Sequence, residues 1–176
     1  MTGIKTFRNF VQNKNKKDRI MKKVNDLLGL KDTGEVNEKL NDLLASFQVY
    51  YQNLRGFHWN VKGKMFFTLH NKFEELYDDA AEKIDEVAER ILTLGGTPLH
   101  TFEDYLKKSK IPVVKNESDG MKLVEATLDN LSILIKIERE LLDVSEKADD
   151  EGTNALVSDF ISEQEKTVWM LNSLLE

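Results

Sequence analysis

The chain contains no cysteine among its 176 residues. Disulfide bonds, thiolate metal sites and cysteine nucleophiles are therefore excluded. Any metal site has to be built from imidazole nitrogen and oxygen donors, a set that suits iron, manganese or zinc better than copper(I).

Helix-breaking residues and long apolar runs are also scarce. The chain has two prolines and nine glycines, and no apolar run is long enough to form a transmembrane helix. The basic N-terminus lacks the apolar segment and small-residue cleavage site of a secretory signal, so we expect a cytoplasmic protein with no membrane partner. With 32% charged and 40% hydrophobic residues, the composition is typical of long helices that are solvated on one face and buried on the other.

Apolar residues recur at the i, i+3, i+4 spacing of amphipathic helices in four long segments. These segments span residues 36–58, 66–94 and 117–147, and the stretch from the break at residues 149–152 to about residue 175. In the third segment the apolar positions are Val124, Leu128, Leu131, Ile135 and Leu142.

The second and third segments are joined by residues 97–116, which is long for a simple helix–helix turn. Phe102, Tyr105 and Leu106 predict a short helix there, ending before Pro112. Two pairs of helices with short loops and one long connection predict an all-α four-helix bundle with a single crossover.

The charge is unevenly distributed between an N-terminal arm and the bundle. Eight Lys or Arg and one Asp give residues 1–23 a net charge of +7, and since the whole chain is −6, the other 153 residues carry −13. We expect residues 1–32 to form a basic arm with a short helix over about 17–29, and residues 33–176 to form the bundle. The arm would bind DNA phosphates through Lys5, Arg8, Lys14, Lys16 and Lys17. The alternative is a docked helix with a solvated basic face.

Five side chains that metals favour lie at fixed spacing: His58, His70, Glu74, Asp85 and Glu89. His58 continues the apolar stripe of the first segment, so its side chain is expected to point into the protein. The other four share one helix and fall within an arc of about 100°. At ~1.5 Å rise per residue, however, His70 and Asp85 lie roughly 22 Å apart along the helix. The five side chains therefore cannot bind one metal ion within a single chain.

A second, antiparallel copy of this helix would complete the site, because His70 and Glu74 of one chain would meet Asp85 and Glu89 of the other. Small residues at Ala80 and Ala81, midway between the half-sites, would let the two helices cross closely at a two-fold axis. The alternative is that this acid-rich helix has an ordinary solvated face and that each histidine is structural.

Residues 50–105 resemble the core of the Dps family of mini-ferritins. The resemblance rests on the His58-Trp59 pair, the second histidine twelve residues later, the Asp-x3-Glu of DEVAER and the Gly-Gly that follows the helix. The wider similarity covers about residues 33–176. It implies a ferritin-like four-helix bundle that forms dimers and then a hollow dodecamer. Such a shell would oxidise Fe(II), preferably with hydrogen peroxide, store ferric mineral, and protect DNA from oxidative damage.

By motif position, the resemblance implies that His58, His70 and Glu74 come from one subunit and Asp85 and Glu89 from its neighbour, together binding up to two iron ions. Many family members have Asp where this chain has Glu74. Trp59 would lie close to the oxidation site, or alternatively would be a packing residue at a helix end.

The Glu-x-x-His pair of larger ferritins is missing, since no histidine follows residue 100. An iron site inside the bundle is therefore not expected, and His100 is expected to be structural.

Two further features leave alternatives open. Asp149, Asp150, Glu151 and Asp159 lie where the family builds acidic three-fold pores, but could form an ordinary polar loop. The basic arm supports a second function, a structural nucleoid protein that coats DNA, which can coexist with iron oxidation.

Overall fold

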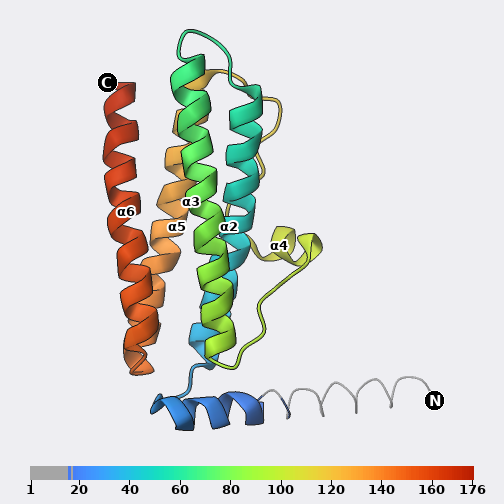
Figure 1. Cartoon of the computed structure of the whole chain (residues 1–176), viewed down its shortest axis with the longest axis vertical. Coiled ribbons are helices and arrows are strands. Elements are labelled where there is room, and N and C mark those ends of the chain that lie inside the picture. Colours follow the sequence, from blue (N-terminus) through green and yellow to red (C-terminus); the bar gives the residue numbers. More distant parts are fainter. Residues whose placement is uncertain (1–15, 17) are drawn as a thin grey trace, which may run out of the picture.

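The computed structural model describes residue 16 and residues 18–176 (Figure 1). Four long helices form the body of the protein: α2 (Gly34–Asn60), α3 (Phe66–Thr93), α5 (Gly120–Lys147) and α6 (Glu151–Leu175). The short α4 (Phe102–Lys108) lies in the connection between α3 and α5. The described residues form no strand, and their only bridge pairs Lys62 with Asp119. The predicted all-α bundle and the short helix in its crossover are confirmed.

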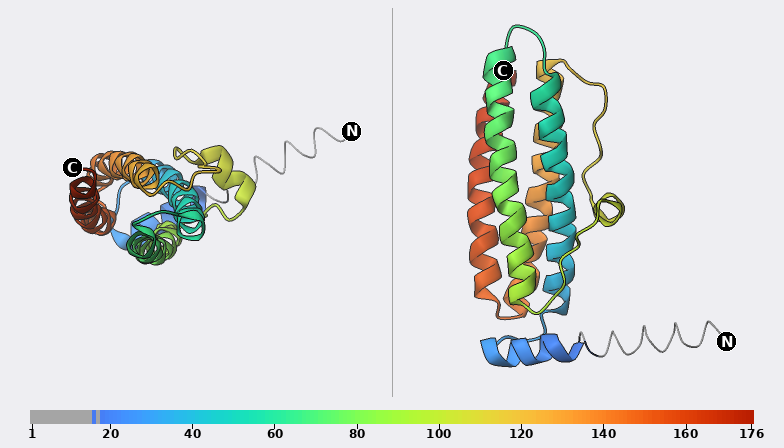
Figure 2. Two further views of the ribbon diagram at one scale, coloured as in Figure 1. Left: turned by 90° about the horizontal axis from the view of Figure 1, so that it is seen from above. Right: turned by 45° about the vertical axis from the view of Figure 1, so that its right-hand side comes forward.

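The long helices pack side by side around one core, as the end-on view shows (Figure 2, left). Short turns make α2 and α3, and also α5 and α6, antiparallel neighbours. The connection after α3 runs along the outside of the bundle to the start of α5, with α4 against α2 (Figure 2, right). Within the part of the chain that the structure describes, no helix has the length and apolar character needed to span a membrane.

The core follows the predicted apolar positions on α2 and α3, and follows them in part on α5. On α3 the fully buried side chains include Leu69, Phe73, Ala80, Val87 and Ile91. On α5 the predicted positions Val124 and Leu131 are buried, whereas Leu128, Ile135 and Leu142 are half buried. The fully buried positions of α5 also include Glu138, which an apolar pattern could not reveal because its side chain is charged in its ordinary form.

Helix α5 begins three residues later than the sequence predicted. Asp119 accepts hydrogen bonds from the backbone N–H of Met121 and Lys122, so its side chain caps the helix at Gly120. Glu117 instead accepts from the backbone N–H groups of the two residues that follow it. A capping carboxylate satisfies N–H groups that the first helical turn leaves free, which places the boundary at Asp119.

A helix over residues 18–28 lies across the lower end of the bundle (Figure 1). The Val24 side chain and the Met21 backbone lie close to Gly95, since a Cβ there would be 3.1 Å from Val24 Cγ2, and Gly95 has a positive φ of 72° just after α3. The predicted arm helix is thus present over the described residues. Of the residues predicted to contact DNA, Lys16 is exposed, and Lys5, Arg8, Lys14 and Lys17 lie outside the described residues.

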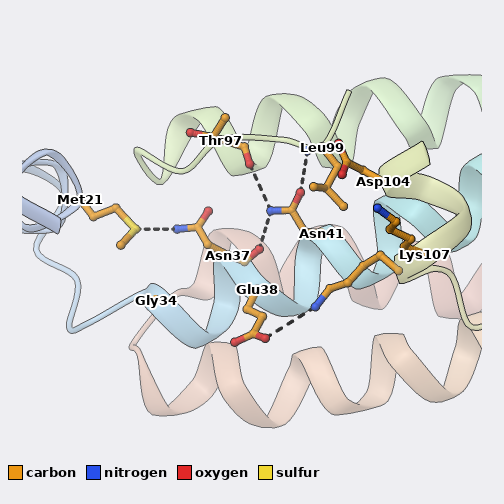
Figure 3. Close-up of a pocket in the computed structure, with 10 residues that line it drawn as sticks. Met21, Gly34, Asn37, Glu38, Asn41, Thr97, Leu99, Asp104 and Lys107 are labelled. Carbon is orange, nitrogen blue, oxygen red and sulfur yellow. Dashed lines mark hydrogen bonds and ion pairs between the residues drawn. The ribbon is translucent and has the colours of Figure 1, made fainter. Parts of the chain in front are cut away.

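Two asparagines on α2 form hydrogen bonds with the helix over residues 18–28 and with the crossover after α3 (Figure 3). Asn37 Nδ2 donates to Met21 Sδ at 3.5 Å. Asn41 Nδ2 donates to the carbonyls of Asn37 and Thr97, while its Oδ1 accepts from the N–H of Leu99. The crossover therefore leaves α3 along a defined path.

Candidate metal centre

Two of the five predicted ligands lie against each other at the turn between α2 and α3. His58 lies in the last turn of α2 and is buried, and His70 lies near the start of α3. The short turn between these antiparallel helices brings the two imidazole rings into a stack, with centroids 3.7 Å apart and planes 20° apart. Phe66 stacks near His70 at 5.1 Å, so the pair is supported by a third ring.

Each histidine forms a hydrogen bond with the backbone of the other. His58 Nδ1 lies 2.8 Å from the carbonyl oxygen of His70, and His70 Nδ1 lies 2.8 Å from the carbonyl oxygen of His58. A carbonyl oxygen can only accept, so both Nδ1 atoms must carry a proton. In the neutral rings the lone pair then lies on Nε2, the atom left to bind a metal. The backbone thus orients both rings and assigns both tautomers.

The third predicted ligand, Glu74, is exposed and lies one helical turn beyond His70. Its Oε1 accepts a hydrogen bond of 3.1 Å from the Tyr77 hydroxyl. Burial and the hydrogen bond to Glu74 raise the pKa of Tyr77 above its usual value. The tyrosine ring also meets His58 edge-on, with 5.5 Å between centroids. Tyr77 was not a predicted site residue, although its position one turn after Glu74 was visible in the sequence.

The remaining two predicted ligands stay apart from this group. Asp85 and Glu89 are exposed on the far half of α3. Asp85 comes eleven positions after Glu74 in the helix, about 16 Å farther along at ~1.5 Å per residue. Across residues 16 and 18–176, no three His, Asp or Glu side chains gather closely enough to hold a metal ion. One chain therefore presents two separate half-sets of ligands, His58 with His70 and Glu74, and Asp85 with Glu89.

The predicted helix crossing needs a correction at Ala80. This side chain is fully buried in the core of its own bundle, so it cannot face a second chain. Ala81 is exposed and remains available at the midpoint between the two half-sites.

Comparison with known proteins places this chain in a family. A family model described as a ferritin-like domain matches residues 37–176. A "DNA protection during starvation protein" of Porphyromonas gingivalis is 46% identical over 155 residues, which cover 87% of this chain and 98% of the relative. The chain belongs to the Dps family of ferritin-like proteins.

Crystal structures of Dps proteins agree with this membership. The Dps protein of Vibrio cholerae O1, described as one of the ferritin-like diiron-carboxylate proteins, is 49% identical with a TM-score of 0.81, covering 82% of this chain and 91% of that chain. The Dps protein of Bacillus brevis is 38% identical with a TM-score of 0.79, covering 80% of this chain and 95% of that one. The predicted ferritin-like bundle is thereby confirmed.

Trp59 of this Dps-family chain lies at the surface rather than in the core. It is 58% exposed, and the Arg55 guanidinium lies over its ring at 4.8 Å. Arg55 also lies 5.4 Å from the ring centroid of Tyr51. Trp59 thus packs on Arg55 at the end of α2, and its position close to the oxidation site stays a prediction.

The acidic turn before α6 is partly used for folding. Asp150 is buried, caps α6 by accepting from the N–H of Thr153, and forms an ion pair with Arg90. Asp149 pairs with Lys31 at 2.8 Å. For Asp150 the structure favours the alternative of an ordinary polar turn, because its carboxylate is enclosed by its own chain. Glu151 and Asp159 are exposed, and their pore role stays a prediction.

The bundle interior contains a buried lysine that sequence reasoning missed. Lys83 is 4% exposed and binds Asp79 and Glu163, the latter at 2.7 Å. Burial lowers the pKa of Lys83, but the hydrogen bonds and charges of these two carboxylates outweigh it and raise the pKa overall. The sequence contained a signal for this burial, because Lys83 lies on the apolar stripe of α3 between Ala80 and Val87.

A buried glutamate faces the same interior from α5. Glu138 accepts a 2.5 Å hydrogen bond from Gln164 Nε2, and burial raises its pKa to about 7. Within the described residues, Glu138 Oε2 and Gln164 Oε1 have no hydrogen-bond partner. A protonated Glu138 carries a hydroxyl that can donate a hydrogen bond, and Gln164 Oε1 is a buried acceptor without a donor.

His100 takes no part in either group of ligands. It is exposed, and its Nδ1 lies 3.1 Å from the carbonyl oxygen of Pro98 in the loop before α4. This position agrees with the structural role expected for it.

Proposed function

We propose that this protein is a ferroxidase that oxidises Fe(II), preferably with hydrogen peroxide, at sites shared between two subunits. The observation that supports this most directly is the reciprocal hydrogen bonding of His58 and His70. It presents two oriented Nε2 lone pairs, and the carboxylate Glu74 lies one helical turn beyond His70, which together give a nitrogen and oxygen donor set suited to Fe(II).

The partner subunit would supply the missing carboxylates. His58, His70 and Glu74 of one chain face Asp85 and Glu89 of a second chain when the two α3 helices run antiparallel, and the two-fold axis produces two equal sites. The exposed Ala81 allows close approach at the crossing. Each site has enough ligands for two iron ions.

The reaction assigns the ligands a role in coordination. Two Fe(II) ions give one electron each to peroxide, whose O–O bond breaks, and two protons complete two molecules of water. The carboxylates stabilise iron as its charge rises from +2 to +3, and the imidazoles keep it in place. Ferric product would then collect as mineral inside a dodecameric shell, and peroxide would be removed without free hydroxyl radical. DNA would be protected by this chemistry.

The test combines mass and activity in the assembled protein. Wild type should have the mass of a dodecamer in solution and consume peroxide only when Fe(II) is present. The double variant His58→Ala, His70→Ala should keep that mass and lose the fast phase of Fe(II) oxidation. Oxidation at the wild-type rate by this variant would show that the site is elsewhere.

DNA binding by the basic arm is a second candidate function. Lys16, Arg19, Lys22 and Lys23 are exposed at the described end of the arm, and several relatives are named for DNA protection during starvation. Deleting residues 1–16, which removes Lys5, Arg8, Lys14 and Lys16, should strongly weaken a DNA mobility shift at low salt while leaving iron oxidation intact. Absence of a shift with the intact protein at low salt would rule this function out.

A further inference from the structure

Tyr77 touches two proposed ligands that come from different helices. Its hydroxyl donates to Glu74 Oε1 at 3.1 Å, and its ring lies edge-on to His58 on α2. Tyr77 is not itself a proposed ligand, but it contacts both an imidazole and a carboxylate of the proposed ligand set.

The position of the Tyr77 ring is determined from α2. Tyr51 packs edge-on against it, with 6.0 Å between centroids, and Arg55 lies over the Tyr51 ring. His58 borders the ring as well. Two α2 side chains, Tyr51 and His58, therefore border the Tyr77 ring, while Glu74 itself is exposed and has three rotatable side-chain bonds.

We propose that Tyr77 is a positioning residue for the metal site, and that it makes Glu74 a ligand with one oxygen. The hydroxyl donates to Oε1, so Oε2 would be the oxygen left to bind a metal. This inference rests on the proposed function for its ligand set, and it concerns how one of those ligands is presented. Outer hydrogen-bond partners of metal ligands act in this way by orienting them before the metal arrives.

The consequence is a measurable coupling between two side chains. Without the hydroxyl, the Glu74 carboxylate is free to rotate or to bind with both oxygens. Loss of such an outer partner typically weakens metal affinity on the order of tenfold or more. The effect should vanish when Glu74 has already lost its charge.

The experiment is a double-mutant cycle with Zn(II) as a redox-inert probe, titrated calorimetrically into the intact assembly. Tyr77→Phe should bind Zn(II) about tenfold more weakly than wild type. In the Glu74→Gln background, adding Tyr77→Phe should change the affinity no further. Tyr105→Phe is the matched control, because it also removes a half-buried hydroxyl, which donates to the Leu99 carbonyl in the crossover, and it should leave the affinity unchanged.

The absorption spectrum of bound Co(II) provides a second measurement that loss of packing alone would not alter. Its visible bands depend on coordination number, so Tyr77→Phe should change their intensity and Tyr105→Phe should not. Unchanged Zn(II) affinity, an unchanged Co(II) spectrum, or an equal loss of affinity in the Glu74→Gln background would each overturn the proposal.

The same titrations separate this proposal from the proposed function. If wild type binds Zn(II) with the predicted coupling but does not consume peroxide with Fe(II), the oxidation proposal fails and the role of Tyr77 stands. If His58→Ala, His70→Ala binds Zn(II) as tightly as wild type, the ligand set is wrong and the Tyr77 proposal is overturned with it.

Discussion

His58 and His70 each donate from Nδ1 to the carbonyl oxygen of the other at 2.8 Å, and their rings stack at 3.7 Å. The end of α2 and the start of α3 are therefore joined by the same two side chains that present the Nε2 atoms. The structure of the turn and the orientation of the proposed ligands depend on each other.

Single histidine substitutions should be almost as damaging as the double substitution. Removing either ring removes a ligand and also deprives the other histidine's carbonyl of its donor. We expect His58→Ala and His70→Ala each to slow Fe(II) oxidation on the order of 100-fold, with little further loss in the double variant. Initial rates of ferric absorbance measure this, with His100→Ala as a control that keeps the wild-type rate. If the double variant instead lost the product of the two single effects, the two histidines would act independently, and their shared geometry would be contradicted.

Mixed assemblies should recover activity from two inactive parents. His58→Ala, His70→Ala lacks one half-site, and Asp85→Asn, Glu89→Gln lacks the other. In a two-fold dimer of one chain of each kind, one of the two sites is fully intact, so random co-assembly should restore about a quarter of the wild-type rate. Initial oxidation rates after unfolding and refolding the parents together measure this. No recovery in assemblies shown to be mixed would mean that the site is not shared between chains.

Stability should fall as the pH rises through about 7 because of Glu138, whose buried carboxyl has its pKa raised to about 7 from an ordinary 4.5. Below the unfolded pKa both states hold the proton, and this contribution is fully present. Between the two pKa values the unfolded state releases the proton first, so the contribution falls and is lost as the pH passes the folded value.

Glu138→Gln should remove this dependence and raise stability at pH 9 by a few kcal/mol, an order-of-magnitude figure. The new amide can both accept from Gln164 and donate to it. Thermal unfolding of the intact assembly at pH 5 and pH 9 measures the effect. Glu165→Gln, which alters an exposed partner of Arg139, is the control. An equal pH dependence in wild type and Glu138→Gln would exclude Glu138 as its source.

Arg90→Ala should destabilise the turn between α5 and α6. Arg90 pairs with the buried Asp150 and donates from Nε to Thr153 Oγ1 at 2.9 Å. Removing it leaves a buried carboxylate without its cation, at a cost of about 3 kcal/mol. Chemical denaturation measures the loss, and Lys31→Ala, which breaks the exposed pair with Asp149, should change stability by less than about 1 kcal/mol. Similar effects of the two substitutions would show that burial of Asp150 is unimportant.

Much of the fold was predictable because its signals are local. The apolar spacing of residues 36–58 and 66–94 predicted α2 and α3 closely, and Phe102, Tyr105 and Leu106 predicted α4. The start of α5 was less accessible, since it depends on which of several nearby carboxylates caps the helix. The core of α5 was predicted only in part, because the buried Glu138 does not look like a core residue.

By itself, the sequence determined the helices, the long crossover and the angular grouping of His70, Glu74, Asp85 and Glu89, because a helix converts spacing along the chain directly into position. Only the tertiary structure decided which ring nitrogens of His58 and His70 carry protons, that Tyr77 holds Glu74, and that Ala80 and Asp150 face inward. Most of these properties depend on groups brought together from separate helices. Their energies come from burial and hydrogen-bond geometry, which spacing along one helix does not specify.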